Sequence, residues 1–333
     1  MCHPRKFKCE KDKEILDQIA IERNIQHKTI EGYYNSAQLF IEYTGRSLIE
    51  SLKLYEKEEE ELVWKRRTIK KDLIGFRTFL QVNYLENTAK VYMQRIMAIF
   101  RHLDLELMPL PNISKKNTNT LPPITHEDLL THDELKEALK LCNPCMKAYL
   151  TFAVSSGCAR AEATSLTIKD YLLANDFSNL EDNLDDLKIR YLIGLIDEDF
   201  IPLFKLKRIK TNKHYFTFCS PQANHYIKEF LLNSERELSL NSSLFGLNKY
   251  YVHKYCAEIN EKLNLGYARK YTRFRAHMFR KYNASTLYNN GMHMEDVDSL
   301  QGRSKDSVHN SYFMENPQKL KDKYCEYVEC LII

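Results

Sequence analysis

The sequence contains little glycine and little proline, with nine residues of each among 333. So few chain-breaking residues argue against extensive disorder and against a β-sandwich, which needs many turns. No apolar run reaches the length of a membrane span, and the mean hydropathy is -0.49. Residues 1–13 are charged and have no apolar central stretch, so we expect no signal peptide. These absences predict a cytoplasmic protein that does not enter a membrane.

Cysteine is diluted as well, with nine residues over the whole chain, and this favours reduced intracellular thiols over a disulfide framework. Cys142 and Cys145 have the spacing of half a zinc or redox site, but no second pair lies at a suitable distance. Pro144 at the start of a helix explains that segment better. Clustered acidic residues and a glycine-rich phosphate loop are both missing, so we predict neither a metal-dependent nuclease nor a P-loop enzyme.

The charge that is present is nearly balanced. The sequence has 49 Lys and Arg against 45 Asp and Glu, a net charge of +4, which indicates a nucleic-acid partner only weakly. One local contrast stands out, because the acidic run 58–61 is followed by Lys65 and Arg66. We interpret this stretch as a solvated helix with Glu-to-Lys pairs, and the alternative is that its basic side faces DNA phosphates.

The length and the pattern of apolar residues predict two domains. Residues 1–112 have helical periodicity, and Thr29 and Thr88 are each expected to cap a helix. Residues 113–124 form a polar, proline-flanked linker. Within residues 125–333, Thr131 begins a capping box. The segments 187–196, 201–209 and 215–219 are rich in β-branched and aromatic residues. The predicted fold is therefore mainly α, with a small antiparallel β-sheet that turns at residues 211–212.

The motifs that indicate chemistry lie in the last seventy or so residues. His277 and Arg280 are three residues apart, which places both side chains on one helix face. Gly302 and Arg303 follow the next helical pattern, and Tyr312 lies nine residues beyond Arg303.

This arrangement resembles the tyrosine recombinase (phage integrase) family, whose C-terminal signature is His-x-x-Arg, then Gly-His or Gly-Trp, then a nucleophilic Tyr nine residues later. The segment 155–162 resembles the family's first arginine motif, and residues 209–213 resemble the hairpin that carries its catalytic lysine. The resemblance covers nearly the whole chain. It implies a helical, SAM-like core-binding domain in residues 1–112 and an α+β catalytic domain in residues 125–333.

The resemblance implies a role for each motif. Tyr312 would attack a DNA phosphorus and store the bond as a 3′-phosphotyrosine, while Lys210 protonates the leaving oxygen, with Lys213 as the alternative. Arg160, Arg280 and His277 would surround the phosphate, because guanidinium groups offer planar forks to phosphate oxygens. Glu162 would support the first arginine. No metal or nucleotide cofactor is needed, since the bond energy is conserved for religation.

Two departures from the family pattern leave alternatives open. Arg303 stands where the family has His or Trp, and it can donate hydrogen bonds but cannot act as a base; His309 is a possible partial substitute. Arg160 lies one residue past the first-arginine position in an ungapped alignment, where Ala159 falls. A catalytically impaired DNA-binding protein on the same scaffold is therefore the rival hypothesis, and a DNA-relaxing topoisomerase with the same chemistry is a third.

The predicted partner is double-stranded DNA, bound by a homotetramer on paired sites, as in an integrase of a mobile element that acts on the nucleoid. The expected DNA contacts are basic or aromatic side chains: Lys65, Arg66, Lys213, Tyr271, Arg273 and Arg275. An apolar stripe runs through residues 320–332, and the family often packs this segment on a neighbouring protomer. The other interpretation is that it folds back onto its own domain.

Overall fold

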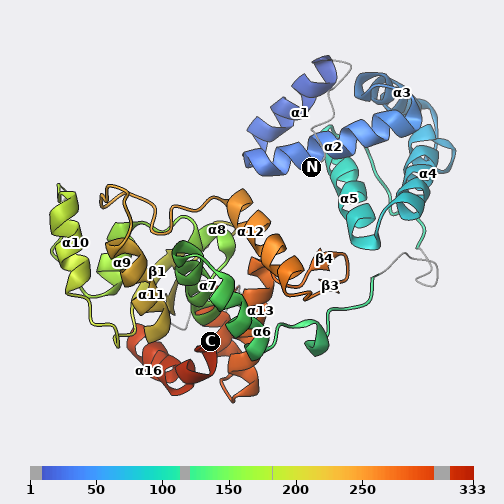
Figure 1. Cartoon of the computed structure of the whole chain (residues 1–333). Coiled ribbons are helices and arrows are strands. Elements are labelled where there is room, and N and C mark those ends of the chain that lie inside the picture. Colours follow the sequence, from blue (N-terminus) through green and yellow to red (C-terminus); the bar gives the residue numbers. More distant parts are fainter. Residues whose placement is uncertain (1–9, 113–120, 182, 304–315) are drawn as a thin grey trace. The chain divides into compact units, whose positions relative to one another are not determined.

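The computed structural model describes residues 10–112, 121–181, 183–303 and 316–333. Tyr312 and His309, and most of the linker expected at 113–124, lie outside these described residues. The chain divides into two compact units, Met1–Pro123 and Ile124–Ile333, and each is considered by itself (Figure 1). In the described part of the chain, no helix has both the length and the apolar character that a bilayer crossing requires.

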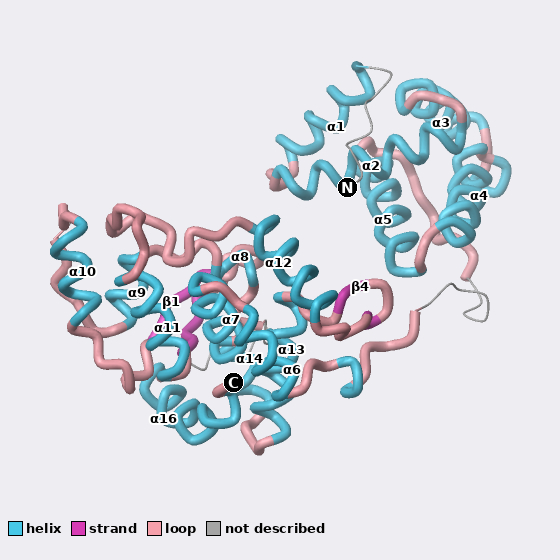
Figure 2. Tube along the Cα trace, viewed as in Figure 1, coloured by secondary structure: helices cyan, strands magenta, loops and turns pink. Residues whose placement is uncertain are grey.

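The first unit is helical in its described part, as Figure 2 shows in cyan. Neither predicted threonine cap is correct, because Thr29 and Thr88 each lie inside the first turn of their helix, two residues after its start. The elements are α1 (Glu10–Glu22), α2 (His27–Thr44), α3 (Leu48–Glu61), η1 (Trp64–Arg66), α4 (Thr68–Asn83) and α5 (Glu86–His102).

The core of the first unit is a cluster of aromatic rings from four helices. Phe40 of α2 lies between Phe76 of α4 and Phe100 of α5, with ring centroids 5.1 and 5.4 Å apart in edge-to-face geometry. Tyr55 of α3 contacts Phe100 in the same way at 5.6 Å. The three phenylalanines are fully buried, and such pairs add to the free energy gained from burying their area.

The stretch that carries Lys65 and Arg66 is not a continuous helix, so the solvated-helix interpretation was wrong. The helix α3 ends at Glu61, and both residues lie exposed on the short 3-10 turn η1. The reason is the next residue, Arg67, which is buried. Its Nε donates to the carbonyl of Leu62 at 2.8 Å, and its Nη1 donates to Glu106 Oε2 at 3.0 Å. Together these bonds hold the chain out of helical geometry.

The second unit is mainly helical with a small antiparallel β-ribbon, as the sequence predicted, and it has a second short antiparallel ribbon, at residues 267–272, that the sequence did not predict (Figure 2). Its central element is α7 (Pro144–Ser156), which α11, α13 and β2 contact. The other elements are η3 (His126–Asp128), α6 (His132–Leu141), α8 (Arg160–Ala163), α9 (Ile168–Ala174), α10 (Asp186–Gly194), β1 (Leu203–Lys207), β2 (His214–Phe218), α11 (Pro221–Leu232), α12 (Lys249–Lys262), β3 (Tyr267–Ala268), β4 (Tyr271–Thr272), α13 (Ala276–Asn289), α14 (Met294–Leu300), α16 (Pro317–Tyr327) and η4 (Val328–Leu331).

The starts of α6 and α7 follow their sequence signals. Thr131 and Glu134 form the predicted capping box of α6. Asn143 caps α7, and Pro144 occupies its first turn, where the missing N–H costs nothing. Burial raises the pKa of the Cys142 thiol to about 12 and that of Cys145 to about 11, so both stay protonated at neutral pH.

The sequence predicted a strand at residues 187–196, and this prediction was wrong. These residues belong to α10 and to the two residues just after it. Asp185 caps this helix by accepting from the backbone N–H of Lys188 at 2.8 Å. Ile189 and Ile193 are fully buried, whereas Tyr191 between them is 67% exposed. A strand would place all three side chains on one face, but a helix separates Tyr191 from the two isoleucines. Arg190 then donates to the carbonyls of residues 231 and 232 at the end of α11 and of residues 234 and 236 just beyond it. Tertiary contacts therefore override the local β propensity.

The hairpin of β1 and β2 is confirmed, with Leu203 opposite Phe218 and Lys207 opposite His214. The C-terminal segment packs on its own unit: Leu320, Tyr324 and Leu331 are buried, and α16 and η4 contact β2, α7 and α13. This single chain therefore follows the fold-back interpretation of the apolar stripe.

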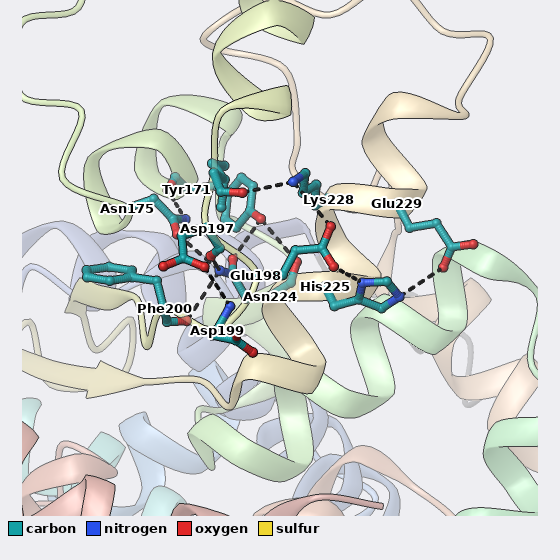
Figure 3. Close-up of polar contacts among 11 residues, drawn as sticks. Tyr171, Asn175, Asp197, Glu198, Asp199, Phe200, Asn224, His225, Lys228 and Glu229 are labelled. Carbon is teal, nitrogen blue, oxygen red and sulfur yellow. Dashed lines mark hydrogen bonds and ion pairs between the residues drawn. The ribbon is translucent and has the colours of Figure 1, made fainter.

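A separate polar cluster fixes the loop before β1 to α11 (Figure 3). Glu198 accepts from His225 Nδ1 at 2.6 Å and pairs with Lys228 Nζ at 3.2 Å. Asn224 is fully buried and donates to the carbonyls of Asp197 and Phe200. Although this cluster is rich in carboxylates, no group of His, Cys, Asp or Glu among the described residues is arranged to hold a metal ion.

The aromatic cluster gives a stability prediction. We expect Phe76→Ala to lower the free energy of unfolding of the first unit by about 3–5 kcal/mol, because it removes a fully buried ring and leaves a cavity. Val82→Ala on the same helix is the control, since Val82 is 75% exposed and its loss should change stability by less than about 0.5 kcal/mol. Urea denaturation followed by circular dichroism measures both, and equal effects would contradict the packing described here.

Candidate active site

The carbonyl groups at the C-terminal end of α7 determine how the second unit assembles. The last carbonyls of a helix have no partner within the helix and must be satisfied from elsewhere. Asn283 of α13 donates to the carbonyls of Val154 and Ser155, both at 2.9 Å. Further donors are Tyr324 Oη to Ser155 at 3.0 Å and Thr217 Oγ1 to Ser156 at 2.8 Å. Three elements distant in sequence therefore meet at one helix end.

Arg280 is held at the same place. Its Nη1 donates to the carbonyl of Gly157 at 2.8 Å, and its Nη2 donates to the carbonyl of Gln301 at 2.6 Å. The residue is only 8% exposed, and burial lowers its pKa, with a smaller contribution from the charge of Arg208. A guanidinium nevertheless stays protonated in proteins. Its cationic group is thus fixed in a direction set by two backbone carbonyls.

Gly157 makes this arrangement possible. It has a φ of +61°, in the left-handed region that side chains rarely adopt, and ends α7. A Cβ built on it would lie 2.2 Å from Asn283 Oδ1 and 2.8 Å from Gln301 Nε2. Those two atoms are hydrogen-bonded to each other at 2.8 Å. Any larger residue would therefore push α13 and the 301–302 turn away from α7.

The short helix α8 directs Arg160. Glu162 is 4% exposed, and its Oε2 accepts from the backbone N–H of Ala159 at 2.9 Å and from Tyr215 Oη at 2.7 Å. These bonds fix the turn from Gly157 into α8, whose first residue is Arg160. Glu162 thus has the supporting position that the resemblance implied.

Arg160, His277 and Arg280 line one pocket of about 260 Å³. The remaining residues around it come from α12 and the segments on either side: Ala159, Val252, His253, Cys256, Arg275 and Ala276. Three arginines and two histidines therefore face this space, and none of the described residues that line it is acidic. A pocket with this lining favours an anion, because the cations have no carboxylate inside it to pair with, and it is called the anion pocket from here on.

His277 remains exposed to solvent at this pocket, yet its pKa is lowered. The main cause is partial desolvation, followed by the positive charges of Lys281, Arg275, Arg280 and Arg303. Both effects penalise a second charge on the imidazole. The ring is therefore neutral at neutral pH and can accept a proton.

The hairpin residues lie at a different place from the pocket. Lys210 is exposed in the turn between β1 and β2 and is not among the described residues that line the pocket. Lys213 Nζ donates to the carbonyl of Arg303 at 3.4 Å. Arg208, half-buried at the end of β1, donates through Nη1 to the carbonyl of Gly302 at 2.6 Å.

The side chain of Arg303 is not in the pocket with Arg160 and Arg280. Its Nη1 pairs with Asp298 Oδ1 at 3.0 Å, and it lines a second hollow of about 370 Å³ between residues 124–129 and the helices α13 and α14. Its charge still lowers the pKa of His277.

Two predicted DNA contacts have other surroundings. Arg273 uses all three of its side-chain nitrogens internally, donating to both Glu134 oxygens and to the carbonyls of residues 128, 129 and 265. Arg273 therefore ties α6 to the end of β4 and is a structural residue; the DNA contact expected from the sequence does not fit these bonds. Arg275 stacks over the Tyr271 ring at 5.0 Å and lines the anion pocket.

Sequence reasoning missed several residues of the site. His253 faces the pocket from a helix that carries no motif, so no sequence signal could have identified it. Asn283 and Gln301 also carry no signal, although Asn283 follows Arg280 by three residues on the same helix. Arg275, two residues before His277, was not missed, because the sequence analysis includes it among the expected DNA contacts.

Residues 128–319 match the model of the phage integrase family. No curated protein sequence matches the chain.

Solved structures share the fold. XerH recombinase bound to its difH substrate has a TM-score of 0.53 and 18% identity, with 96% of this chain and 82% of that chain covered. The Tn1549 transposon integrase in complex with circular intermediate DNA has a TM-score of 0.57 and 11% identity, covering 95% and 98%. A lambda integrase tetramer bound to a Holliday junction has a TM-score of 0.51 and 14% identity, covering 91% and 76%.

The surroundings of His277 predict its titration. We expect its C2 proton to titrate below the ordinary value near 6.5, and Lys281→Met to move the midpoint upward because one neighbouring cation is removed. Since the folded state favours the neutral ring, this contribution to stability is present above pH 6.5 and is lost as the pH falls through the folded-state pKa.

Proton NMR measures this midpoint directly. Lys254→Met is the matched control, because Lys254 is an exposed cation of α12 that pairs with Glu258 and is not among the causes of the shift. A midpoint at or above the ordinary value in the unmodified protein would contradict the electrostatic description of the pocket.

Proposed function

Because the chain belongs to the phage integrase family of tyrosine-type site-specific DNA recombinases, we propose that it cleaves and rejoins duplex DNA through a 3′-phosphotyrosine on Tyr312. The observation that carries this proposal is the anion pocket, where Arg160 and Arg280 face the same space and none of the described residues that line it is acidic. Arg160 was the least secure residue of the sequence motif. Its place beside Arg280 favours an enzyme over an impaired binding protein.

The pocket residues suit a backbone phosphate in the following way. Arg160 and Arg280 donate to the non-bridging oxygens and stabilise the charge that builds up at phosphorus. Buried carbonyls hold Arg280 in place before the phosphate arrives, so little reorganisation is needed during the reaction. Arg275 and His253 complete the positive surroundings.

The cleavage step then balances as follows. The phenol oxygen of Tyr312 forms a bond to phosphorus and gives its proton to neutral His277. The bond from phosphorus to the 5′-oxygen breaks, and this oxygen keeps the electron pair and takes a proton from Lys210. Religation is the reverse, with the free 5′-hydroxyl as nucleophile, and neither direction consumes a metal ion or a nucleotide.

Each unit is proposed to supply DNA contacts of its own. Exposed Lys65 and Arg66 supply phosphate contacts from the first unit, and Lys213, Tyr271 and Arg275 supply them from the second. We further propose a homotetramer on paired sites, for which the lambda integrase tetramer on a Holliday junction is the supporting relative. Such a protein acts in the cytoplasm, on nucleoid DNA, as a mobile-element integrase does.

The nucleophile can be tested without knowing the target sequence. A pool of duplexes with randomised sequence and a nick near the cleaved position traps the covalent complex, because the released strand segment diffuses away. Denaturing gels and sequencing of the protein-linked strands give the preferred site. We expect Tyr312→Phe to abolish the adduct and to leave DNA affinity within about threefold, since only the nucleophilic oxygen is removed.

Each of the other outcomes favours a different hypothesis. An adduct that persists in Tyr312→Phe refutes the assignment of the nucleophile. Shifted DNA without any adduct from the unmodified protein points to the DNA-binding rival. Relaxation of supercoiled plasmid by a monomer points to a topoisomerase.

The first arginine is tested on the site recovered in that experiment. We expect Arg160→Ala to slow adduct formation by about 100- to 1,000-fold, which is typical when one donor to a developing oxyanion is lost. Lys254→Ala removes an exposed cation of the neighbouring helix α12 and serves as the control for general loss of charge. If both variants slow cleavage to the same extent, Arg160 acts only through bulk electrostatics.

A further inference from the structure

The turn that follows α14 receives side chains from two other elements. The carbonyl of Gln301 accepts from Arg280 Nη2 at 2.6 Å, and the carbonyl of Gly302 accepts from Arg208 Nη1 at 2.6 Å. The free carbonyls at a helix C-terminus carry partial negative charge and attract cations. One turn therefore holds both the pocket arginine and an arginine of the β1–β2 hairpin.

Arg208 occupies the last fixed position before the hairpin turn. Phe204 and Leu206 point inward from β1, and the alternation of a strand places Arg208 on the same face. Its backbone N–H donates to the carbonyl of Lys213 at 2.8 Å, and its carbonyl accepts from Asn212 at 2.8 Å. Lys210 lies two residues further along this closed turn.

The Gln301–Gly302 turn packs closely against strand β2 of the hairpin. Gly302 has a φ of +59°, and a Cβ built on it would lie 2.6 Å from the ring of Tyr215 on β2. A shift of the hairpin base would therefore press the Tyr215 ring against the turn or break the bonds of Arg208. The hairpin is fixed on both of its strands.

We propose that Arg208 is a positioning residue, which ties the base of the hairpin to the Gln301–Gly302 turn and so places Lys210 for proton transfer. This inference rests on the function proposed above. Because Lys210 does not line the pocket itself, its distance from the phosphate depends on where the hairpin is held. The Gln301–Gly302 turn binds Arg280 directly and binds the Lys210 hairpin through Arg208, so the positions of both residues depend on the same backbone segment.

The structural half of the proposal is tested on the full chain without DNA. We expect Arg208→Met to speed hydrogen exchange of the amides at positions 208, 211 and 212 by about 10- to 100-fold, the effect of losing a hydrogen bond from a charged donor. These three N–H groups make the backbone hydrogen bonds of the hairpin turn. For Arg208→Lys, which retains one donor group, we expect an exchange rate between those of the unmodified protein and Arg208→Met. Lys207→Met is the matched control, because it removes a neighbouring cation from the exposed face of β1.

The catalytic half uses two versions of the recovered DNA site, with either oxygen or sulfur at the 5′ bridging position of the cleaved phosphate. A thiolate leaves without needing a proton, so a sulfur substrate does not depend on Lys210. We expect the Arg208→Met variant to cleave the oxygen substrate up to about 100-fold more slowly than the unmodified protein does. Its rate on the sulfur substrate should stay within about threefold of that of the unmodified protein. Lys210→Ala should show the same pattern.

Three results separate the possibilities. Unchanged exchange at positions 208, 211 and 212 overturns the proposal, and so does slow cleavage of both substrates, which would assign Arg208 to phosphate binding or to folding. Equal slowing by Lys207→Met also overturns it. An unmodified protein that forms no adduct on either substrate refutes the proposed function and the role in proton transfer, while the exchange measurement still decides whether Arg208 holds the hairpin.

Discussion

The burial of Arg280 is the constraint on which the second unit depends. A guanidinium cannot lose its charge by releasing a proton, so it needs acceptors wherever it is buried. Here the carbonyls of Gly157 and Gln301, at the ends of α7 and α14, supply them. Both carbonyls belong to turns with a glycine at positive φ, Gly157 and Gly302, and these turns bring the backbone close enough. The site is thus built from helix ends.

The same arrangement explains why the pocket favours an anion. Backbone carbonyls compensate the buried charge of Arg280 only in part, and Glu162 is occupied by Ala159 and Tyr215. Arg160 and Arg275 add positive charge to the space. The pKa of His277 is lowered mainly by partial desolvation, and then by the charges of Lys281, Arg275, Arg280 and Arg303. A phosphate that enters would meet preorganised donors and a ring able to take a proton, which are the requirements for transfer to a phenol.

Peripheral elements are attached to this frame through a few directed bonds. The hairpin is tied by Arg208, and the C-terminal segment by the hydrogen bond of Tyr324 to Ser155. The first unit has an independent aromatic core around Phe40, and its basic turn at Lys65 and Arg66 exists because Arg67 folds inward. The two units therefore have separate hydrophobic cores.

The sequence alone determined the helical class, the hairpin, the motif residues and the capped starts of α6 and α7, because those features depend on local spacing and on side chains that bond their own backbone. Local patterns misjudged α10, where the burial of Ile189 and Ile193 and the bonds of Arg190 outweigh β propensity. Only the tertiary structure decided that Arg160 shares a pocket with Arg280, that Arg303 pairs with Asp298 and that Arg273 is structural. The direction of a long cationic side chain is set by acceptors that are distant in sequence, and no spacing rule contains them.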